Sequence, residues 1–208
     1  MSNVESQNVI KVWDPLVRIF HWSLVLFFLT AYLTEDDFEN IHIYAGYAVS
    51  ILIGFRLIWG AIGPKYARFS NFVKGPAETL AYLKSLITGN PRHYIGHNPA
   101  GGIMVVALLV VLAATGFTGM ALLAVDGGGP LAGTLIANFN EDLLEGLHEL
   151  LANTSVLLVV LHVAGVLVSS LLHRENLIRA MFTGVKVHKA VAEEQHLEEA
   201  ADLRRRHD

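Results

Sequence analysis

The 208-residue chain contains no cysteine, and only 16% of its residues are charged. The missing cysteine excludes disulfides, thiolate metal sites, iron–sulfur clusters and covalently attached haem. An ordinary soluble domain is about one quarter charged, whereas this chain is 53% hydrophobic with a mean hydropathy of +0.45. A water-soluble globular domain is therefore not expected. The net charge of −4 also gives no basic face for nucleic acid.

Four apolar segments are long enough to cross a bilayer, whose hydrocarbon core of roughly 30 Å needs about 20 helical residues. They span residues 16–33, 41–62, 101–125 and 143–172. The first segment carries Arg18, His21 and Trp22 and lacks a signal-peptide cleavage pattern, so it is expected to stay in the mature protein. The predicted fold class is an all-α integral membrane protein with a bundle of four transmembrane helices.

Basic residues are confined to one side of these segments, apart from one within the second. All 15 Lys and Arg residues lie at or before the start of the first segment, within the second, between the second and third, or after the fourth. The loops at 34–40 and 126–142 carry only acidic charge. Because cytoplasmic loops are enriched in Lys and Arg, both termini are predicted to be cytoplasmic.

Little further organisation is visible outside the four segments. Gly75-Pro76 opens an amphipathic stretch at 77–87, which is expected to form a helix along the cytoplasmic interface. The sequence shows no repeat and no second domain. We assign residues 1–189 to one membrane domain and residues 190–208 to a charged cytoplasmic tail.

Four histidines lie inside the apolar segments, where ionisable side chains are costly and by default functional. His21 lies near the cytoplasmic start of the first segment, and His42 near the outer start of the second. His148 and His162 are 14 residues apart in the fourth apolar segment. In a helix they therefore lie on nearly the same face and about 21 Å apart along the axis. This predicts His21 with His162 at the inner level and His42 with His148 at the outer level, as two bis-histidine haems require.

Each of these residues also has a simpler interpretation. A histidine in a transmembrane helix can serve as a hydrogen-bonding group between helices, although two matched levels are harder to explain in that way. Arg56 follows His42 by 14 residues, so it would lie at the inner level, where a buried guanidinium could pair with haem propionates. It could equally extend to the inner interface and stay solvated. The sequence leaves both roles of Arg56 open.

Short motifs accompany these histidines over residues 12–189. They are Arg18-Ile-Phe-His21-Trp22, His42-x-x-x-Gly46-Tyr47, Arg56-Leu-Ile-Trp59-Gly60, Gly96-His97-Asn98-Pro99-Ala100-Gly101, His148-Glu149 and His162-x-x-Gly165-Val166. The set resembles the bacterial cytochrome b561 family, and with it the b-type cytochrome subunits of nickel–iron hydrogenases and respiratory formate dehydrogenases.

The resemblance implies a bacterial inner-membrane protein with two non-covalent haem b groups that exchanges electrons with membrane quinone. The family's ligand pairs carry over to His21 with His162 and His42 with His148. Its quinone site lies beside the inner haem near the start of the third segment, which makes His97 and Asn98 candidates. One departure is a short first outer loop, since only 21 residues separate His21 from His42.

The favoured hypothesis is an electron-transfer subunit that connects quinone to a periplasmic or membrane-bound partner, such as a cytochrome c or a hydrogenase-like subunit. The alternative is a self-contained superoxide:quinone oxidoreductase, which the acidic outer loops disfavour because they would repel an anion. A histidine-based proton or metal transporter ranks third. The sequence lacks the intramembrane carboxylates and broken helices that such transporters use.

Reporter fusions test the predicted orientation. Fusions after Asp36 or Gly128 should report a periplasmic position. Fusions after Lys84 or Ala190 should report a cytoplasmic position, because the segments rich in Lys and Arg are predicted to be cytoplasmic. Paired alkaline phosphatase and fluorescent-protein reporters give the measurement. A periplasmic signal at Lys84 would contradict the predicted topology.

Overall fold

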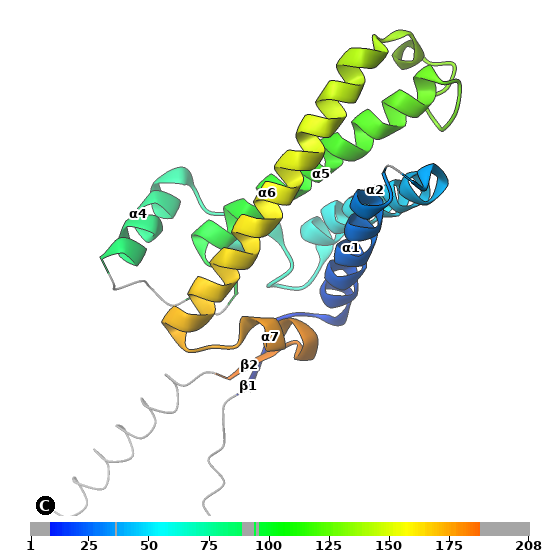
Figure 1. Cartoon of the computed structure of the whole chain (residues 1–208). Helices are drawn as coiled ribbons and strands as arrows, with labels where there is room; N and C mark the ends of the chain where they lie inside the picture. The colour runs from blue at the N-terminus through cyan, green and yellow to red at the C-terminus, as the bar shows by residue number, and fades with distance from the viewer. Residues whose placement is uncertain (1–8, 36, 89–93, 95, 188–208) are drawn as a thin grey trace, which may run out of the picture.

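The structure is a computed structural model that describes residues 9–35, 37–88, 94 and 96–187, and it is almost entirely helical (Figure 1). The elements in chain order are β1 (Val9–Lys11), α1 (Pro15–Leu33), α2 (Glu39–Ile62), α3 (Phe69–Phe72), α4 (Pro76–Ile87), α5 (Pro99–Val125), η1 (Leu135–Asn138), α6 (Glu141–His173), α7 (Leu177–Thr183) and β2 (Val185–Val187). Four helices, α1, α2, α5 and α6, are long and apolar enough to cross a membrane. The four predicted spans are thereby confirmed, whereas the proposed tail at 190–208 lies outside the described residues.

Polar caps fix where three of the long helices begin. The Asp14 carboxylate accepts two backbone amides of the first turn of α1 at 3.0 and 3.2 Å. Asn98 caps α5 with a 2.7 Å hydrogen bond, and Asn140 caps α6 with one of 2.8 Å. The first amides of a helix have no partner within the helix, so these side chains define the starting points locally.

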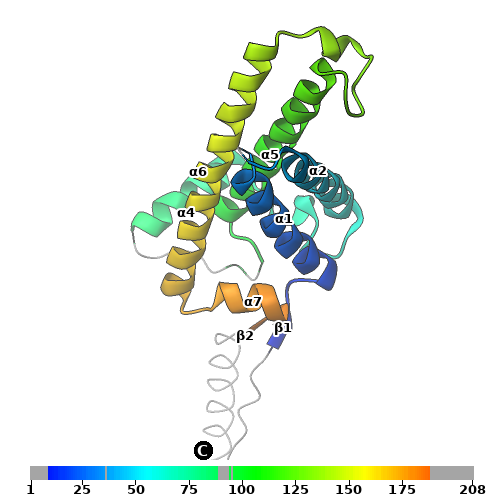
Figure 2. The same ribbon diagram turned by 45° about the vertical axis from the view of Figure 1, so that its right-hand side comes forward.

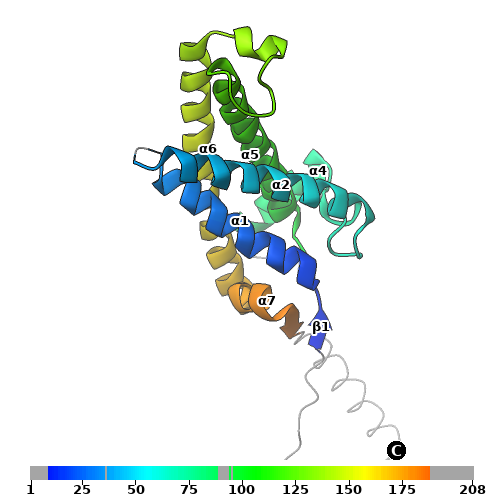
Figure 3. The same ribbon diagram turned by 90° about the vertical axis from the view of Figure 1, so that its right-hand side faces the viewer.

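The long helices form two hairpins. α1 packs on α2, α5 packs on α6, and the hairpins meet chiefly through α2 and α5 (Figure 1). The hairpins are inclined to each other, and the loop end of α5 and α6 projects beyond α1 and α2 (Figure 3). Among the described residues α1 and α6 hardly approach each other at the backbone level. α6 is therefore held mainly by its partner in the hairpin.

The apolar core lies where α1, α2 and α5 meet. Its buried members are Phe20, Val49, Ile53, Leu109 and Leu112. By contrast, α6 buries only Leu144 and Ser155 along its described length. The exposed leucine and valine side chains of α6 suit contact with lipid, because a bilayer interior is as apolar as they are.

Both described ends of the chain meet in a small sheet, a feature that the predicted all-α bundle did not include. β1 pairs antiparallel with β2, so that Val9 lies opposite Val187. Next to it, Lys186 and Glu175 form an ion pair of 3.1 Å. α7 lies across this end of the bundle, between the end of α6 and the start of α1 (Figure 2). The two ends therefore lie on one side, and the compartment that they face stays a prediction.

The amphipathic stretch expected at 77–87 is confirmed as helix α4, which lies beside α5 and away from α1 (Figure 1). Thr79 and Tyr82 are buried on its inner face, while Leu80 and Leu83 are exposed. An exposed leucine pair on a short helix next to a bundle suits an interfacial position.

Gly60 lets the segment after α2 fold back closely on that helix. A Cβ at Gly60 would overlap the ring of Phe69, whereas no atom lies within 4 Å of a Cβ at Gly54 in the same helix. We expect Gly60→Ala to destabilise the protein, because overpacking costs about 1–3 kcal/mol and the gain in helix propensity is about 1 kcal/mol. Thermal unfolding in detergent, followed by circular dichroism, measures the difference.

Gly54→Ala is the matched control and should keep or raise the unfolding temperature, since it gains helix propensity without a clash. Equal unfolding temperatures for the two variants would argue against close packing at Gly60.

Candidate functional site

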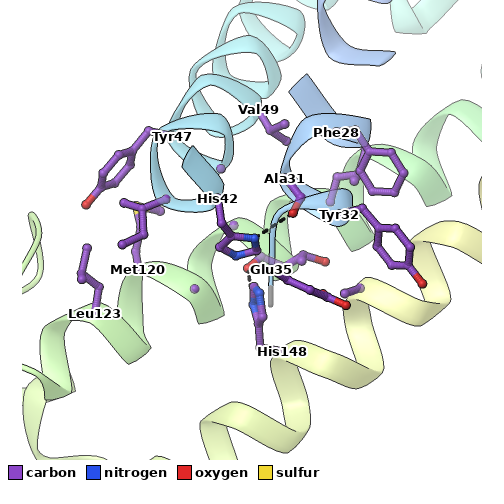
Figure 4. A pocket seen from close by; sticks show the side chains of 17 residues that line it. Phe28, Ala31, Tyr32, Glu35, His42, Tyr47, Val49, Met120, Leu123 and His148 are labelled. Atoms are coloured by element: carbon purple, nitrogen blue, oxygen red, sulfur yellow. Dashed lines mark hydrogen bonds between the residues drawn. The ribbon is translucent and has the colours of Figure 1, made fainter. Parts of the chain in front are cut away.

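His42 of α2 and His148 of α6 face each other, each near the start of its helix (Figure 4). Their ring centroids are 6.1 Å apart, with an angle of 78° between the ring planes. Both line a cavity of about 110 Å³, together with Gly46. The cavity walls are mostly apolar and include Phe28, Val49, Met120 and Leu123. This pocket matches the outer histidine level expected from the sequence.

Hydrogen bonds hold both of these rings at the Nδ1 atom. Nδ1 of His42 lies 2.9 Å from the carbonyl oxygen of Ala31. Nδ1 of His148 lies 3.0 Å from the hydroxyl of Thr118 and 3.1 Å from the carbonyl oxygen of Thr115. A carbonyl oxygen only accepts, so Nδ1 of His42 carries the proton and its Nε2 is left free.

The second pair lies nearer the chain termini. The rings of His21 in α1 and His162 in α6 have centroids 6.5 Å apart, with an angle of 51° between their planes. Trp22 packs edge-on against His21 at 5.0 Å. Nδ1 of His21 is buried and has no hydrogen-bond partner in the described part of the chain. The structure thus brings together the same two pairs that the spacing predicted.

Both separations fit a metal atom between the rings. A metal–imidazole bond is about 2 Å long and the nitrogen lies roughly 1 Å from its ring centre, so two rings on opposite faces of one metal have centroids roughly 6 Å apart. The observed values are 6.1 and 6.5 Å. Each pair also joins α6 to a helix of the other hairpin, with which it is not closely packed. Each pair therefore has a separation that could accommodate a metal atom between its two rings.

Unsatisfied polar nitrogens gather around the inner pair. Within the described residues, five buried side-chain nitrogens lack a hydrogen-bond partner: Arg18 Nε, His21 Nδ1, Trp22 Nε1, Arg56 Nη1 and His97 Nδ1. A buried polar group left unpaired costs about 1–3 kcal/mol. An acceptor-bearing, negatively charged group in this region would satisfy such donors.

Arg56 is buried, so the alternative in which its side chain extends to the solvated interface is wrong. Only 3% of the residue is exposed. Its Nη2 donates to the carbonyl of Ala67 at 3.0 Å, and the guanidinium lies 4.6 Å from the ring centre of Phe69. Nη1 stays available as a donor.

Arg18 and Trp22 also lie beside His21, although the sequence alone did not predict them as site residues. Nη1 of Arg18 donates to the carbonyl of Phe182 in α7, and the Trp22 ring stacks on the Phe182 ring at 4.2 Å. Both contacts tie α7 to α1 beside His21. Their positions in the sequence could have predicted this, because Arg18 precedes His21 by about one helical turn and Trp22 directly follows it.

His97 and Asn98 have different surroundings. The ring of His97 is wedged between Trp13 and Phe72, with centroid distances of 4.6 and 4.5 Å. Burial, with the nearby positive charge of Arg56 as a second cause, lowers the pKa of His97 to about 3, so the imidazole is neutral at neutral pH. The side-chain oxygen of Asn98 is already occupied as the cap of α5. Asn98 thus has a structural role as a helix cap, and its contact with quinone stays a prediction.

Comparison with known families decides the assignment. Residues 12–184 match the family model for prokaryotic cytochrome b561. The chain belongs to this cytochrome b561 family. The resemblance seen in the motifs is confirmed, and the protein is a multi-pass membrane b-type cytochrome of electron transport, with haem b as the cofactor that the family implies.

Two relatives extend this result over nearly the whole cytochrome. A probable Ni/Fe-hydrogenase B-type cytochrome subunit of Azotobacter vinelandii is 27% identical over 224 residues. The protein of the same description from Azotobacter chroococcum mcd 1 is 26% identical over 225 residues. Each alignment covers 90% of this chain and 92% of the relative. No solved structure gives a significant match.

Proposed function

We propose that this cytochrome binds two haem b groups, one between His21 and His162 and one between His42 and His148, and connects membrane quinone to a redox partner on the opposite side. The observation that carries the proposal is the pair of ring separations, 6.5 and 6.1 Å, at two levels of one helix. Haem b supplies a one-electron centre when bound. The chain's own contribution is to fix the ligands, neutralise charge and admit quinone.

The outer histidines are prepared for ligation by their hydrogen bonds. Since Nδ1 of His42 donates to Ala31, the nitrogen with a free lone pair is Nε2. Around this pair the cavity is lined mainly by apolar side chains, as suits a planar hydrophobic cofactor. Gly46, one turn from His42, lines the cavity with no side chain to obstruct it.

At the inner level, Arg56 and Arg18 are proposed to hold haem propionates. Each has a buried guanidinium nitrogen without a hydrogen-bond partner in the described residues. The buried indole N–H of Trp22 also lacks one. Charge-assisted hydrogen bonds to carboxylates are about twice as strong as neutral ones. Burying the charge of Arg56 is costly, so a propionate paired with it would remove part of that cost.

The proposed partner is a hydrogenase-like redox subunit, because both relatives are described as hydrogenase cytochrome subunits. The outer end of α6 carries Glu141, Asp142, Glu145 and Glu149, which would complement a basic docking face. A soluble cytochrome c with such a face is the second candidate. The same acidic charge disfavours superoxide as substrate, since it would repel the anion.

Quinone is proposed to exchange electrons near His97, whose neutral imidazole lies close to the inner pair. A neutral imidazole can donate or accept a hydrogen bond with a quinone oxygen. Nδ1 of His97 has no other partner in the described residues, which leaves it free for this contact.

Single replacements of the paired histidines test the ligand assignment. His21→Ala and His162→Ala should each remove the same spectral component and lower the haem content from about two to about one per chain, because a bis-histidine site loses half of its ligands. His42→Ala and His148→Ala should remove the other component. Pyridine haemochrome assays and low-temperature α-band spectra of purified protein measure both quantities.

His173→Ala removes a histidine at the end of α6, outside both pairs, and should retain both components. A wild-type ratio near one haem per chain would contradict the proposal. So would loss of one and the same component in His21→Ala and His42→Ala.

Replacement of His97 tests the quinone site. His97→Ala should slow reduction by quinol analogues while both haem spectra and reduction by dithionite stay unchanged, because the residue is proposed to contact quinone and not iron. Asn98→Asp keeps the oxygen that caps α5 and removes the amide donor, so it probes Asn98 without loss of the helix start. Stopped-flow spectroscopy gives the rates. Wild-type quinol kinetics in both variants would move the quinone site elsewhere.

A further inference from the structure

His148 is held by the neighbouring helix α5 at its Nδ1 atom. This nitrogen lies 3.0 Å from the hydroxyl oxygen of Thr118 and 3.1 Å from the carbonyl oxygen of Thr115. Thr118 is buried, with 5% of the residue exposed, so bulk water does not compete for the contact. The orientation of the His148 ring is therefore set across the α5–α6 interface.

The direction of this hydrogen bond follows from the other contacts of the hydroxyl. The Thr118 oxygen lies 3.1 Å from the carbonyl of Ala114 and 2.9 Å from the carbonyl of Thr115, and carbonyls only accept. The single hydroxyl proton is donated within α5, so the oxygen accepts from His148. Nδ1 of His148 then carries the proton, and Nε2 is the nitrogen left to bind a metal.

Gly119 makes room for the ring beside this hydrogen bond. A Cβ at Gly119 would lie 3.0 Å from Cε1 of His148 and 3.5 Å from its Nδ1. Carbon atoms pack best at about 3.5–4.0 Å, so any side chain here would push the imidazole aside. Thr118 and Gly119 together form a cradle for the His148 ring.

Two of the other paired histidines lack an equivalent side-chain partner in the described part of the chain. Nδ1 of His42 donates to a backbone carbonyl, which no substitution removes, and Nδ1 of His21 has no partner. A substitution of Thr118 can therefore change the hydrogen bonding of His148 without replacing either histidine of the outer pair.

We propose that Thr118, which shares the Nδ1–H of His148 with the carbonyl of Thr115, is a positioning residue that lowers the midpoint potential of the outer haem by accepting its part of this hydrogen bond. The inference rests on the proposed function, because it requires a haem between His42 and His148. A hydrogen bond accepted from Nδ1–H makes the imidazole a more basic ligand, which favours ferric over ferrous iron. Hydrogen bonding around the ligands is one of the means by which a protein sets a haem potential.

The test compares Thr118→Val with Thr118→Ser in the purified holoprotein. Valine keeps the shape of threonine without the hydroxyl, while serine keeps the hydroxyl. Spectroelectrochemical titration of the α-band should show a positive shift of one component in Thr118→Val, up to about a tenfold change in its oxidised-to-reduced ratio, or 59 mV for a one-electron couple. The low-spin ferric signal of the same haem in electron paramagnetic resonance should move as well.

Thr118→Ser should return both readouts toward the wild-type values. Thr154→Val is the matched control, because the Thr154 hydroxyl also donates within its own transmembrane helix, to Leu150, and touches neither pair. It should leave both potentials unchanged. A shift of equal size in the control or in Thr118→Ser overturns the inference, and so do unchanged potentials in Thr118→Val.

A variant that loses the outer haem still leaves the inference testable. If Thr118→Val is purified without that haem, Thr118→Cys replaces the hydroxyl by a weaker acceptor and should give a smaller positive shift. A wild-type potential in Thr118→Cys then overturns the inference.

Haem content separates this inference from the proposed function. One haem in the wild type, or two haems in His148→Ala, refutes the haem assignment before any potential is measured. Two haems with an unchanged potential in Thr118→Val refute only the role of Thr118.

Discussion

The attachment of α6 to the other hairpin is the constraint on which the rest of this structure depends. Helices in a bilayer gain no hydrophobic driving force from packing together, and α6 buries only Leu144 and Ser155. Its links to α1 and α2 are the two histidine pairs, supported at one end by α7. In the proposed holoprotein the ligand bonds at two levels would therefore hold the bundle together as well as the cofactors, which couples haem binding to assembly.

The two ends of the bundle differ in a way that suits different tasks. The outer pair lies in a mostly apolar cavity, and both rings are tied by hydrogen bonds. The inner pair lies among unpaired buried nitrogens, two of them on Arg18 and Arg56, with the neutral His97 close by. The first environment favours a fixed electron carrier, and the second favours binding of acceptor-bearing groups. α7 and the β1–β2 sheet lie near the His21–His162 pair, where they connect the described ends of the chain to the start of α1.

Much of this arrangement was predictable because transmembrane helices are regular. Once α6 is continuous, the 14-residue interval between His148 and His162 places both rings on one face, whatever the loops do. The burial of Arg56 was not predictable, since it depends on Ala67 and Phe69, which reach it only when the segment after α2 folds back.

Other features were missed for distinct reasons. The strands β1 and β2 are three residues each and pair across almost the whole chain, so no local pattern reveals them. The capping role of Asn98, in contrast, was available from its position before a proline, a common helix start. Thr118 was missed because a threonine in a transmembrane helix usually bonds its own backbone, and the sequence does not show which neighbour its oxygen meets.

The polar groups between α5 and α6 show how a transmembrane interface can orient a ligand without a charge. The hydroxyls of Thr115, Thr118 and Ser155 each lie 2.9 Å from a backbone carbonyl oxygen of their own helix. With its proton used in this way, the Thr118 oxygen meets His148 as an acceptor, while the hydroxyls of Thr115 and Ser155 also lie 3.4 Å from each other. The Thr118 oxygen and the Thr115 carbonyl both accept at His148, so these two contacts require the proton on Nδ1. The preference for one tautomer thus costs no buried charge, and it leaves Nε2 of His148 directed to the pair with His42.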